Sequence, residues 1–140
     1  VEGVKVDQLI GDGETLRIGK FALTAIATPG HSPGGTSWRW TSCENGKCLD
    51  IVYADSISAV SADEYRFSDH PEYVAPLRAT ISRVAAIKPC DILITPHPSA
   101  SALFERLVGE MPLVRPNGCA EYAVGAKTRL ENRLAKESAK

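Results

Sequence analysis

Residues 36–56, TSWRWTSCENGKCLDIVYADS, decide the fold because they predict a β-hairpin whose register can be counted. Asn45-Gly46 is the strongest two-residue turn signal, and β-forming residues flank it on both sides. With these two residues as the loop, Cys43 faces Cys48 at a non-hydrogen-bonded position, with Cα atoms about 4.5 Å apart. That separation permits a disulfide bond.

The same register sorts the side chains of the hairpin onto two faces. One face is apolar and is expected to be the core face; it carries Trp38, Trp40, Leu49, Ile51 and Tyr53. The other is expected to be mainly polar, with Arg39, Thr41, Cys43, Cys48 and Asp50. A disulfide on the polar face indicates an oxidising compartment, whereas four free thiols in a cytosolic protein are the alternative. A C-x4-C spacing with no nearby Cys or His partner is not a zinc-ligand pattern.

The rest of the chain predicts a single mixed α/β layered unit around this hairpin. Further short strands are expected at 6–10, 15–19, 21–28 and 91–95. A helix is expected to begin at Pro71 and to end near Lys88-Pro89. A short helix within 97–108 and a terminal helix over 117–138 complete the expected elements.

Three of the expected strands point the same way, so the residues that follow them meet at one rim of the sheet. Strands 21–28 and 49–54 flank strand 36–42 in antiparallel fashion, and strand 91–95 follows a helical crossover that makes it parallel to 49–54. The residues collected at this rim are His31, Asp55, Ser56, Ser58 and His97. Polar groups from three distant segments at one edge predict a functional site there.

The composition excludes several classes of protein. The 140 residues, 44% hydrophobic and 24% charged, are typical of a globular chain and not of a disordered one or a coiled coil. A net charge of −1 without a basic run argues against nucleic acid as a partner. No stretch approaches the ~20 apolar residues that span a bilayer, so no membrane segment is expected. The chain begins with Val1 and its only methionine is Met111, which indicates a processed chain or a piece of a longer one.

Two kinds of chemistry compete for the rim residues. GHSPG, at 30–34, matches the G-x-S-x-G motif of serine hydrolases. However, Pro33 has no backbone N–H for an oxyanion hole, and a strand follows where a helix is needed. His31 and His97, beside Pro and Gly, suit zinc, although two histidines are fewer than the three protein ligands of catalytic zinc. Ordinary hydrogen-bonded loop histidines are the alternative, and His70 is expected to be structural.

Four segments resemble the C-terminal half of subclass B3 metallo-β-lactamases, and together they run through nearly the whole chain. They are GDGETLRIGKFALTAIATPGHSPGGTSW (11–38), YADSISAVSADEYRFSDHPEY (53–73), CDILITPHPSAS (90–101) and CAEYAVGAKTRLENRLAKE (119–137). TPGHSPGG alone indicates only the broader metallo-β-lactamase superfamily, which includes glyoxalase II-like thioesterases, whereas YADSISA with TPHPSAS is more specific. The resemblance implies half of an αββα sandwich, a mixed sheet with helices on one face.

The resemblance also implies a role for each rim residue. His31 would be the third ligand of a first zinc ion, and His97 a ligand of a second. Ser56 and Ser58 would bind the carboxylate of a β-lactam, directly or through water, while Asp55 would be structural or would support the ligands. The nucleophile would be a zinc-bound hydroxide and no side chain. Two disulfides are implied, Cys43 with Cys48 and Cys90 with Cys119.

The family's H-x-H-x-D-H motif, which supplies the remaining zinc ligands, does not occur in residues 1–140. We therefore expect residues 1–140 to be the C-terminal part of a metallo-β-lactamase domain, with the N-terminal half as the missing partner. The tryptophan face of the hairpin would pack against that half. The complete enzyme is expected to be a periplasmic or secreted hydrolase that opens β-lactam antibiotics with two zinc ions and confers resistance. The isolated chain is expected to lack a complete metal site and to have little activity.

Two alternatives stay open. The chain could belong to another hydrolase of the same superfamily, acting on a thioester or lactone, although a serine at Ser56 disfavours this. It could also be a non-catalytic fragment that assembles through its exposed sheet face, because a large apolar patch is a typical interaction surface.

Overall fold

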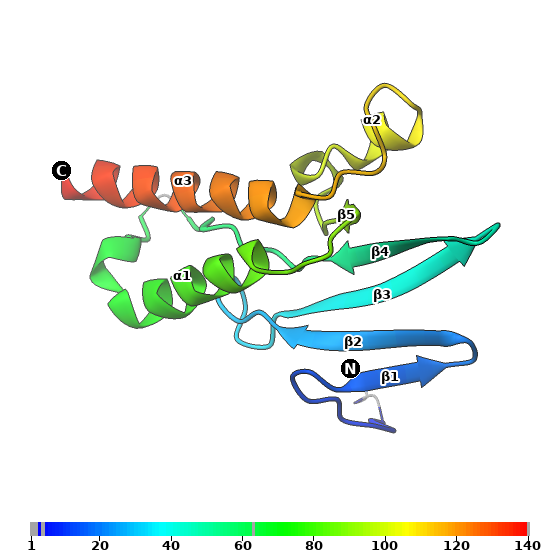
Figure 1. Ribbon diagram of the computed structural model, residues 1–140. Helices are drawn as coiled ribbons and strands as arrows, with labels where there is room; N and C mark the ends of the chain where they lie inside the picture. The colour runs from blue at the N-terminus through cyan, green and yellow to red at the C-terminus, as the bar shows by residue number, and fades with distance from the viewer. Residues whose placement is uncertain (1–2, 4, 63, 140) are drawn as a thin grey trace.

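The computed structural model describes residues 3, 5–62 and 64–139. Within these residues the strands form a five-stranded sheet in the order β1-β2-β3-β4-β5 (Figure 1). The strands are β1 (Thr15–Ile18), β2 (Phe21–Ala27), β3 (Thr36–Glu44), β4 (Lys47–Tyr53) and β5 (Ile92–Ile94). The first four pair antiparallel in sequence order, and β5 returns through a helix to pair parallel with β4. The predicted mixed sheet and strand directions are confirmed.

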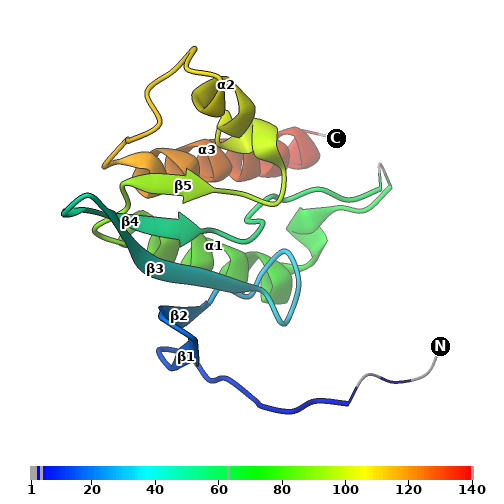
Figure 2. The same cartoon turned by 90° about the vertical axis from the view of Figure 1, so that its right-hand side faces the viewer.

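Helices α1 and α3 lie on one face of this sheet, as predicted, and α2 lies past its β5 edge (Figures 1 and 2). They are α1 (Pro71–Ala85), α2 (Leu103–Leu107) and α3 (Gly118–Ser138), with single 3₁₀ turns η1 (Phe67–Asp69) and η2 (Pro98–Ala100). The proline at the start of α1 is favourable because its missing N–H has no partner in the first helical turn. None of the helices in the described part of the chain has the length and apolar character needed to cross a membrane.

The hairpin has the register that its sequence predicts. Cys43 pairs with Cys48, and a disulfide joins them with Cα atoms 4.0 Å apart. Both loop residues have positive φ, 51° at Asn45 and 76° at Gly46, which matches the preference of this dipeptide for a tight hairpin turn. The register of this hairpin and the pairing of Cys43 with Cys48 therefore follow directly from the Asn-Gly turn.

The second disulfide joins Cys90, just before β5, to Cys119 in the first turn of α3. Both residues are completely buried, and their Cα atoms are 6.1 Å apart. This bond fastens the long terminal helix to the strand that carries His97 at its far end.

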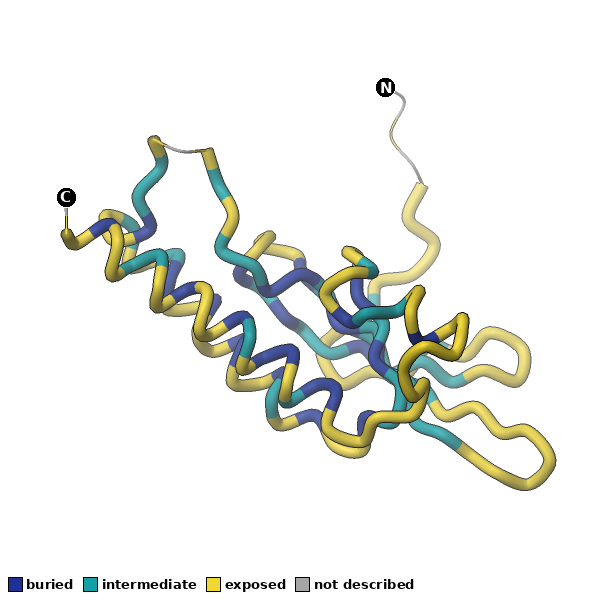
Figure 3. The backbone as a smooth tube through the Cα atoms, turned by 90° about the horizontal axis from the view of Figure 1, so that it is seen from above, coloured by how far each residue is buried: buried dark blue, intermediate teal, exposed yellow. Residues whose placement is uncertain are grey.

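The core lies on the sheet face opposite to the one that the sequence pattern suggested. The core face is the one that carries Arg39 of β3 and its partner Val52 of β4. Helices α1 and α3 cover this face, and their buried positions turn toward the sheet (Figure 3). The buried cluster includes Val52, Leu77, Val84, Leu93 and Leu130. Trp38 and Trp40 are only half-buried on the uncovered face. The alternation of side chains along the hairpin strands sorts them correctly onto two faces of the sheet. It does not predict which of these faces the helices cover.

The uncovered face is apolar along the whole sheet. We call it the open face; cross-strand pairing assigns to it Leu16, Ile18, Phe21, Leu23, Ala25, Trp38, Trp40, Leu49, Ile51, Tyr53, Ile92 and Ile94. Side chains at its β1 end are well exposed, 58% at Ile18 and 47% at Phe21. A continuous apolar surface of this kind is typical of an interaction face.

The strand expected at residues 6–10 is wrong. These residues form no strand, and Val6 and Leu9 are 66% and 85% exposed. Their alternating pattern finds no ladder partner, because β1 at the sheet edge pairs only with β2. The chain is instead held just before β1 by Asp12, which accepts a hydrogen bond from the backbone N–H of Ala27 at 2.8 Å and pairs with Arg83 at 2.7 Å.

The end of α3 anchors the loop that runs from β4 to α1. The carboxylate of Glu137, a residue only 6% exposed, accepts hydrogen bonds from the Arg133 side chain and from the backbone N–H of Ser68 at 2.8 Å. Arg133 also donates to the Tyr65 carbonyl at 2.7 Å. Burial raises the pKa of Glu137, but the hydrogen bonds from Arg133, Ser68 and Phe67 outweigh it and lower that pKa from 4.5 to about 2.

Glu137→Gln is therefore expected to destabilise the fold in a pH-dependent way. A carboxylate whose pKa falls on folding contributes stability above its unfolded pKa, and this is lost as the pH falls from about 4.5 toward 2. At pH 7 the melting temperature should fall by about 5 °C. The difference between the wild type and the variant should vanish near pH 2.

The matched control is Glu131→Gln on the same helix, whose carboxylate pairs with Arg78 at the solvent-exposed surface. Exposed pairs contribute little, so this variant should melt close to the wild type. An equal loss of stability in both variants, or a Glu137→Gln effect that persists unchanged to pH 2, would contradict this account.

Candidate metal-binding and substrate-binding rim

The rim predicted from strand directions exists. β2 and β4 end at the same edge of the sheet (Figure 1), and β5, which runs parallel to β4, ends at that edge too (Figure 2). The pairing continues one residue past β4, where the Ala54 N–H donates to the Ile94 carbonyl at 2.9 Å. Three segments therefore follow strand ends at this edge, and each carries one or more of the predicted site residues. They are 28–35 after β2, 54–58 after β4 and 95–97 after β5.

The loop 28–35 is built around two glycines that no other residue replaces without strain. Gly30 has φ +147°, and a Cβ there would lie 2.8 Å from the Leu77 Cα on α1. A Cβ on Gly35 would lie 2.4 Å from the Thr28 carbonyl oxygen. The Thr28 N–H donates to the Gly35 carbonyl at 2.8 Å and closes the loop. The loop thus packs directly against the helix layer and presents His31 at its exposed tip.

The imidazole of His31 is oriented by its own neighbours. Its Nδ1 lies 2.9 Å from the Ser58 carbonyl oxygen. A carbonyl can only accept, so Nδ1 carries the proton and the neutral ring keeps its lone pair on Nε2. The Tyr73 hydroxyl donates to the His31 carbonyl at 2.9 Å, and burial together with Tyr65 raises the pKa of Tyr73, which keeps this donor protonated. This arrangement is the usual one for a metal-binding histidine.

Ser56 and Ser58 form a hydroxyl pair beside His31. Their Oγ atoms are 2.8 Å apart. Ser56 is only 5% exposed, whereas Ser58 is half-buried and its carbonyl is the partner of His31. The structure therefore links three of the predicted site residues through consecutive hydrogen bonds.

Asp55 is engaged with backbone groups. One carboxylate oxygen accepts from the Ser56 N–H at 2.7 Å, and the other accepts from the Thr36 N–H at 3.2 Å. Its own N–H donates to the Ser37 hydroxyl at 3.0 Å. These contacts tie the end of β4 to the start of β3, and the supporting or structural role of Asp55 stays a prediction.

His97 follows β5 and precedes the turn η2. Its carbonyl accepts hydrogen bonds from the Thr95 hydroxyl at 2.8 Å and from the Ala100 N–H at 2.9 Å, which fixes the backbone around it. The residue is exposed, and its imidazole makes no hydrogen bond to any residue that the structure describes. The ring is free to bind a ligand.

These residues do not complete a zinc site by themselves. Catalytic zinc takes three protein ligands and an open position. Among the described residues no group of three or more His, Cys, Asp or Glu side chains is arranged to hold a metal ion. The chemistry of His31 and His97 suits zinc, but further ligands are required.

The positions of Ser32 and His70 bear on two further predictions, the serine nucleophile and the structural histidine. Ser32 lies in an exposed loop that leads through Pro33 into β3 rather than into a helix, so it has no nucleophile elbow. His70 stacks on Tyr65, with ring centroids 4.6 Å apart, and its Nδ1 lies 3.1 Å from Glu72. This places His70 at the start of α1, in the structural role expected of it.

Tyr73 is the site residue that the sequence pattern did not identify. It lies on α1, 42 residues after His31, and its hydroxyl reaches the His31 carbonyl. No local motif marks such a contact, since it depends on how α1 packs against the loop.

Comparison with known proteins gives a consistent result. Metallo-β-lactamase MIM-1 from Novosphingobium pentaromativorans is 48% identical to this chain, with a TM-score of 0.90. MEM-A1, a subclass B3 metallo-β-lactamase from a soil metagenome library, is 40% identical, with a TM-score of 0.83. The chain resembles subclass B3 metallo-β-lactamases. The match covers 99% and 93% of this chain but only 50% and 52% of those two structures.

A more distant relative shows the breadth of the superfamily. Mouse mitochondrial persulfide dioxygenase ETHE1 is 47% identical over 63 residues, which are 45% of this chain and 20% of that protein. No family model matches the chain. The chain thus spans about half the length of the metallo-β-lactamases that it matches, and the fold and sequence likeness extend through nearly all of it.

Proposed function

We propose that this chain contributes part of the active site of a zinc-dependent hydrolase that opens the β-lactam ring of antibiotics. The observation that carries the proposal is His31, whose Nδ1 is held by the Ser58 carbonyl so that Nε2 is left as a ligand at the rim. The likeness to metallo-β-lactamases supports β-lactams as the substrate class.

Each rim residue has a role in this proposal. His31 and His97 each present one imidazole to a different zinc ion, and the remaining ligands come from the complementary half of the domain. Zinc, when bound by a complete ligand set, supplies the Lewis acid and the activated water of the reaction. Ser58 donates its hydroxyl to the carboxylate of the β-lactam. The buried Ser56 hydroxyl orients Ser58 through the bond between their Oγ atoms.

The open face supports a complementary half as the partner. A sheet that is covered by helices on one side and is apolar on the other is half of a two-layer arrangement. Packing of the other half onto the open face would bury Trp38, Trp40 and their neighbours and would close the rim from the opposite side. The two disulfides support a periplasmic or extracellular location.

A second candidate function is hydrolysis of a thioester or lactone on the same rim. The likeness over 63 residues to ETHE1, a persulfide dioxygenase, supports considering a substrate other than a β-lactam. The hydroxyl pair of Ser56 and Ser58 argues for a carboxylate-bearing substrate instead.

Reconstitution tests the proposed function and separates these candidates. The chain is mixed with the half of the Novosphingobium enzyme that it does not match, in the presence of zinc, and hydrolysis of nitrocefin and of a glutathione thioester is followed. Nitrocefin hydrolysis should appear in the mixture and not with either half alone, and a metal chelator should abolish it. Turnover of the thioester without nitrocefin turnover would favour the second candidate, and an assembly that turns over neither would favour a non-catalytic fragment.

A further inference from the structure

One face of α1 holds the loop that carries His31. Three residues of the helix, spaced i, i+4 and i+7 and therefore on one face, make the contacts: Tyr73, Leu77 and Thr80. The loop residues that they contact are consecutive and in reverse order, His31, Gly30 and Pro29. The helix therefore follows the loop backbone residue by residue, with a hydrogen bond at each end and the close approach of Leu77 to Gly30 between them.

Thr80 makes the contact at the Pro29 end, and it does so in an unusual way. A hydroxyl inside a helix can donate to the carbonyl four residues earlier in the same helix. The helix hydroxyls that do this here, each at 3.0 Å, are those of Ser82, Thr128 and Ser138. Thr80 is only 3% exposed and donates instead to the Pro29 carbonyl of the loop. Its hydroxyl thus serves the loop and not the helix.

Tyr73 makes the contact at the histidine itself. Its ring packs beside Phe67, with centroids 5.8 Å apart, so the ring has a packing partner that does not depend on its hydroxyl. The hydroxyl donates to the His31 carbonyl at 2.9 Å, whereas the imidazole is held separately, by the Ser58 carbonyl at 2.9 Å from Nδ1. Two independent contacts therefore hold the backbone and the ring of a residue that is otherwise exposed.

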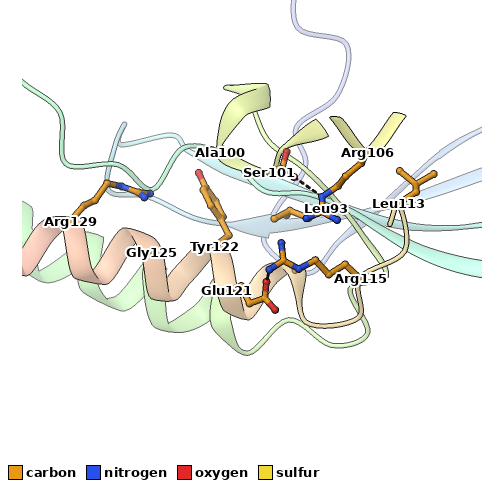
Figure 4. Close-up of a pocket in the computed structure, with 11 residues that line it drawn as sticks. Leu93, Ala100, Ser101, Arg106, Leu113, Arg115, Glu121, Tyr122, Gly125 and Arg129 are labelled. Carbon is orange, nitrogen blue, oxygen red and sulfur yellow. Dashed lines mark hydrogen bonds and ion pairs between the residues drawn. The ribbon is translucent and has the colours of Figure 1, made fainter. Parts of the chain in front are cut away.

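The other long helix approaches the rim less closely. Tyr122 of α3 lies among the residues that line a pocket of about 190 Å³ beside that helix (Figure 4). Its hydroxyl is 3.5 Å from the Asp55 carbonyl, which is longer than an ordinary hydrogen bond between two oxygen atoms. Tyr122 thus offers a comparison for Tyr73, because both are helix tyrosines that point a hydroxyl at a rim carbonyl.

We propose that Tyr73 and Thr80 are positioning residues for His31, which fix the loop backbone so that the imidazole stays on the Ser58 carbonyl. Free histidine prefers to carry its proton on Nε2, so the form that leaves Nε2 open to a ligand must be imposed by the hydrogen bond at Nδ1. Outer contacts orient metal-binding histidines in this way. The inference rests on the proposed function only for the ligand role of His31, and the arrangement itself can be tested without zinc.

¹⁵N NMR of the full 140-residue chain at about pH 8.5, where an ordinary imidazole is neutral, reports the tautomer of each histidine. The wild type should show His31 mainly with the proton on Nδ1. Tyr73→Phe keeps the ring and removes the hydroxyl, so it should shift His31 toward the Nε2–H form while the melting temperature falls by only about a few degrees. Thr80→Val should cause the same shift with a larger loss of stability, because it leaves the Pro29 carbonyl without its partner.

The matched controls are Tyr122→Phe on α3 and Ser82→Ala on the exposed side of α1. Each removes one hydroxyl from a helix, and neither should change the tautomer of His31. In the assembled pair, Tyr73→Phe should raise the zinc concentration needed for half-maximal nitrocefin hydrolysis about tenfold, with kcat at saturating zinc close to that of the wild type.

Four results would overturn the proposal: wild-type His31 with its proton on Nε2, an unchanged tautomer in Tyr73→Phe, an equal shift in Tyr122→Phe, or an unchanged zinc requirement of an active Tyr73→Phe assembly. Failure of the proposed function is distinguishable from all of these. It would leave the tautomers of the isolated chain as expected, while the assembled wild type would not hydrolyse nitrocefin.

Discussion

Replacing His31 or His97 by Ala in the reconstituted enzyme is expected to lower kcat/KM for nitrocefin by about 10³-fold or more. In the proposed site each substitution removes an imidazole from a different metal ion, and a zinc site with one ligand missing loses both affinity and the geometry of its open position. The measurement is initial-rate kinetics at fixed zinc, together with metal content after dialysis, which should fall in both variants.

The matched control for these variants is His70→Ala. His70 is the remaining histidine of the chain, but it stacks on Tyr65 at the start of α1 and does not belong to the rim. This variant should keep nearly full activity and its metal. If His31→Ala or His97→Ala retained more than about a tenth of the activity while the assembly stayed folded, the assignment of that histidine as a ligand would be wrong.

Gly30→Ala is expected to be strongly damaging to both stability and activity. The added Cβ would lie 2.8 Å from the Leu77 Cα, a backbone atom that cannot move aside, and φ at this position is +147°. The combined steric and conformational cost is about 3 kcal/mol or more. Because Gly30 directly precedes His31, the substitution should also displace the His31 imidazole. Urea denaturation of the chain and nitrocefin kinetics of the assembly measure the two effects.

Gly34→Ala is the matched control in the same loop. No atom lies within 4 Å of a Cβ placed there, and the backbone is not in the left-handed region. This variant should have the stability and activity of the wild type. A Gly30→Ala chain that is as stable as Gly34→Ala would show that the loop does not pack against α1 as described.

The parts of the fold that depend on local chemistry could be predicted from sequence. Asn45-Gly46 fixes both φ values of the hairpin turn, and counting from it gives the pairing of Cys43 with Cys48. Strand directions then follow from the short connections and the helical crossover, which is why the sequence alone places His31, Ser56 and His97 at one rim.

The features that depend on tertiary packing could not be predicted. Alternation grouped Trp38 and Trp40 together, but which face the helices cover depends on the contacts of α1 and α3. Residues 6–10 alternate as a strand would, yet a strand needs a ladder partner, and no described residue pairs with β1 on its outer side. The contacts of Tyr73 with His31 and of Thr80 with Pro29 join segments whose proximity no local pattern encodes.

Zinc content tests most directly the central claim that this chain supplies half of a metal site through His31 and His97. The chain, the complementary half and their mixture are each dialysed against the same zinc buffer, and the metal is measured by atomic emission. We expect about two zinc ions per assembled pair, in parallel with nitrocefin hydrolysis, and no tightly held zinc in the isolated chain. Two tightly bound zinc ions and β-lactam hydrolysis in the isolated chain would contradict the account.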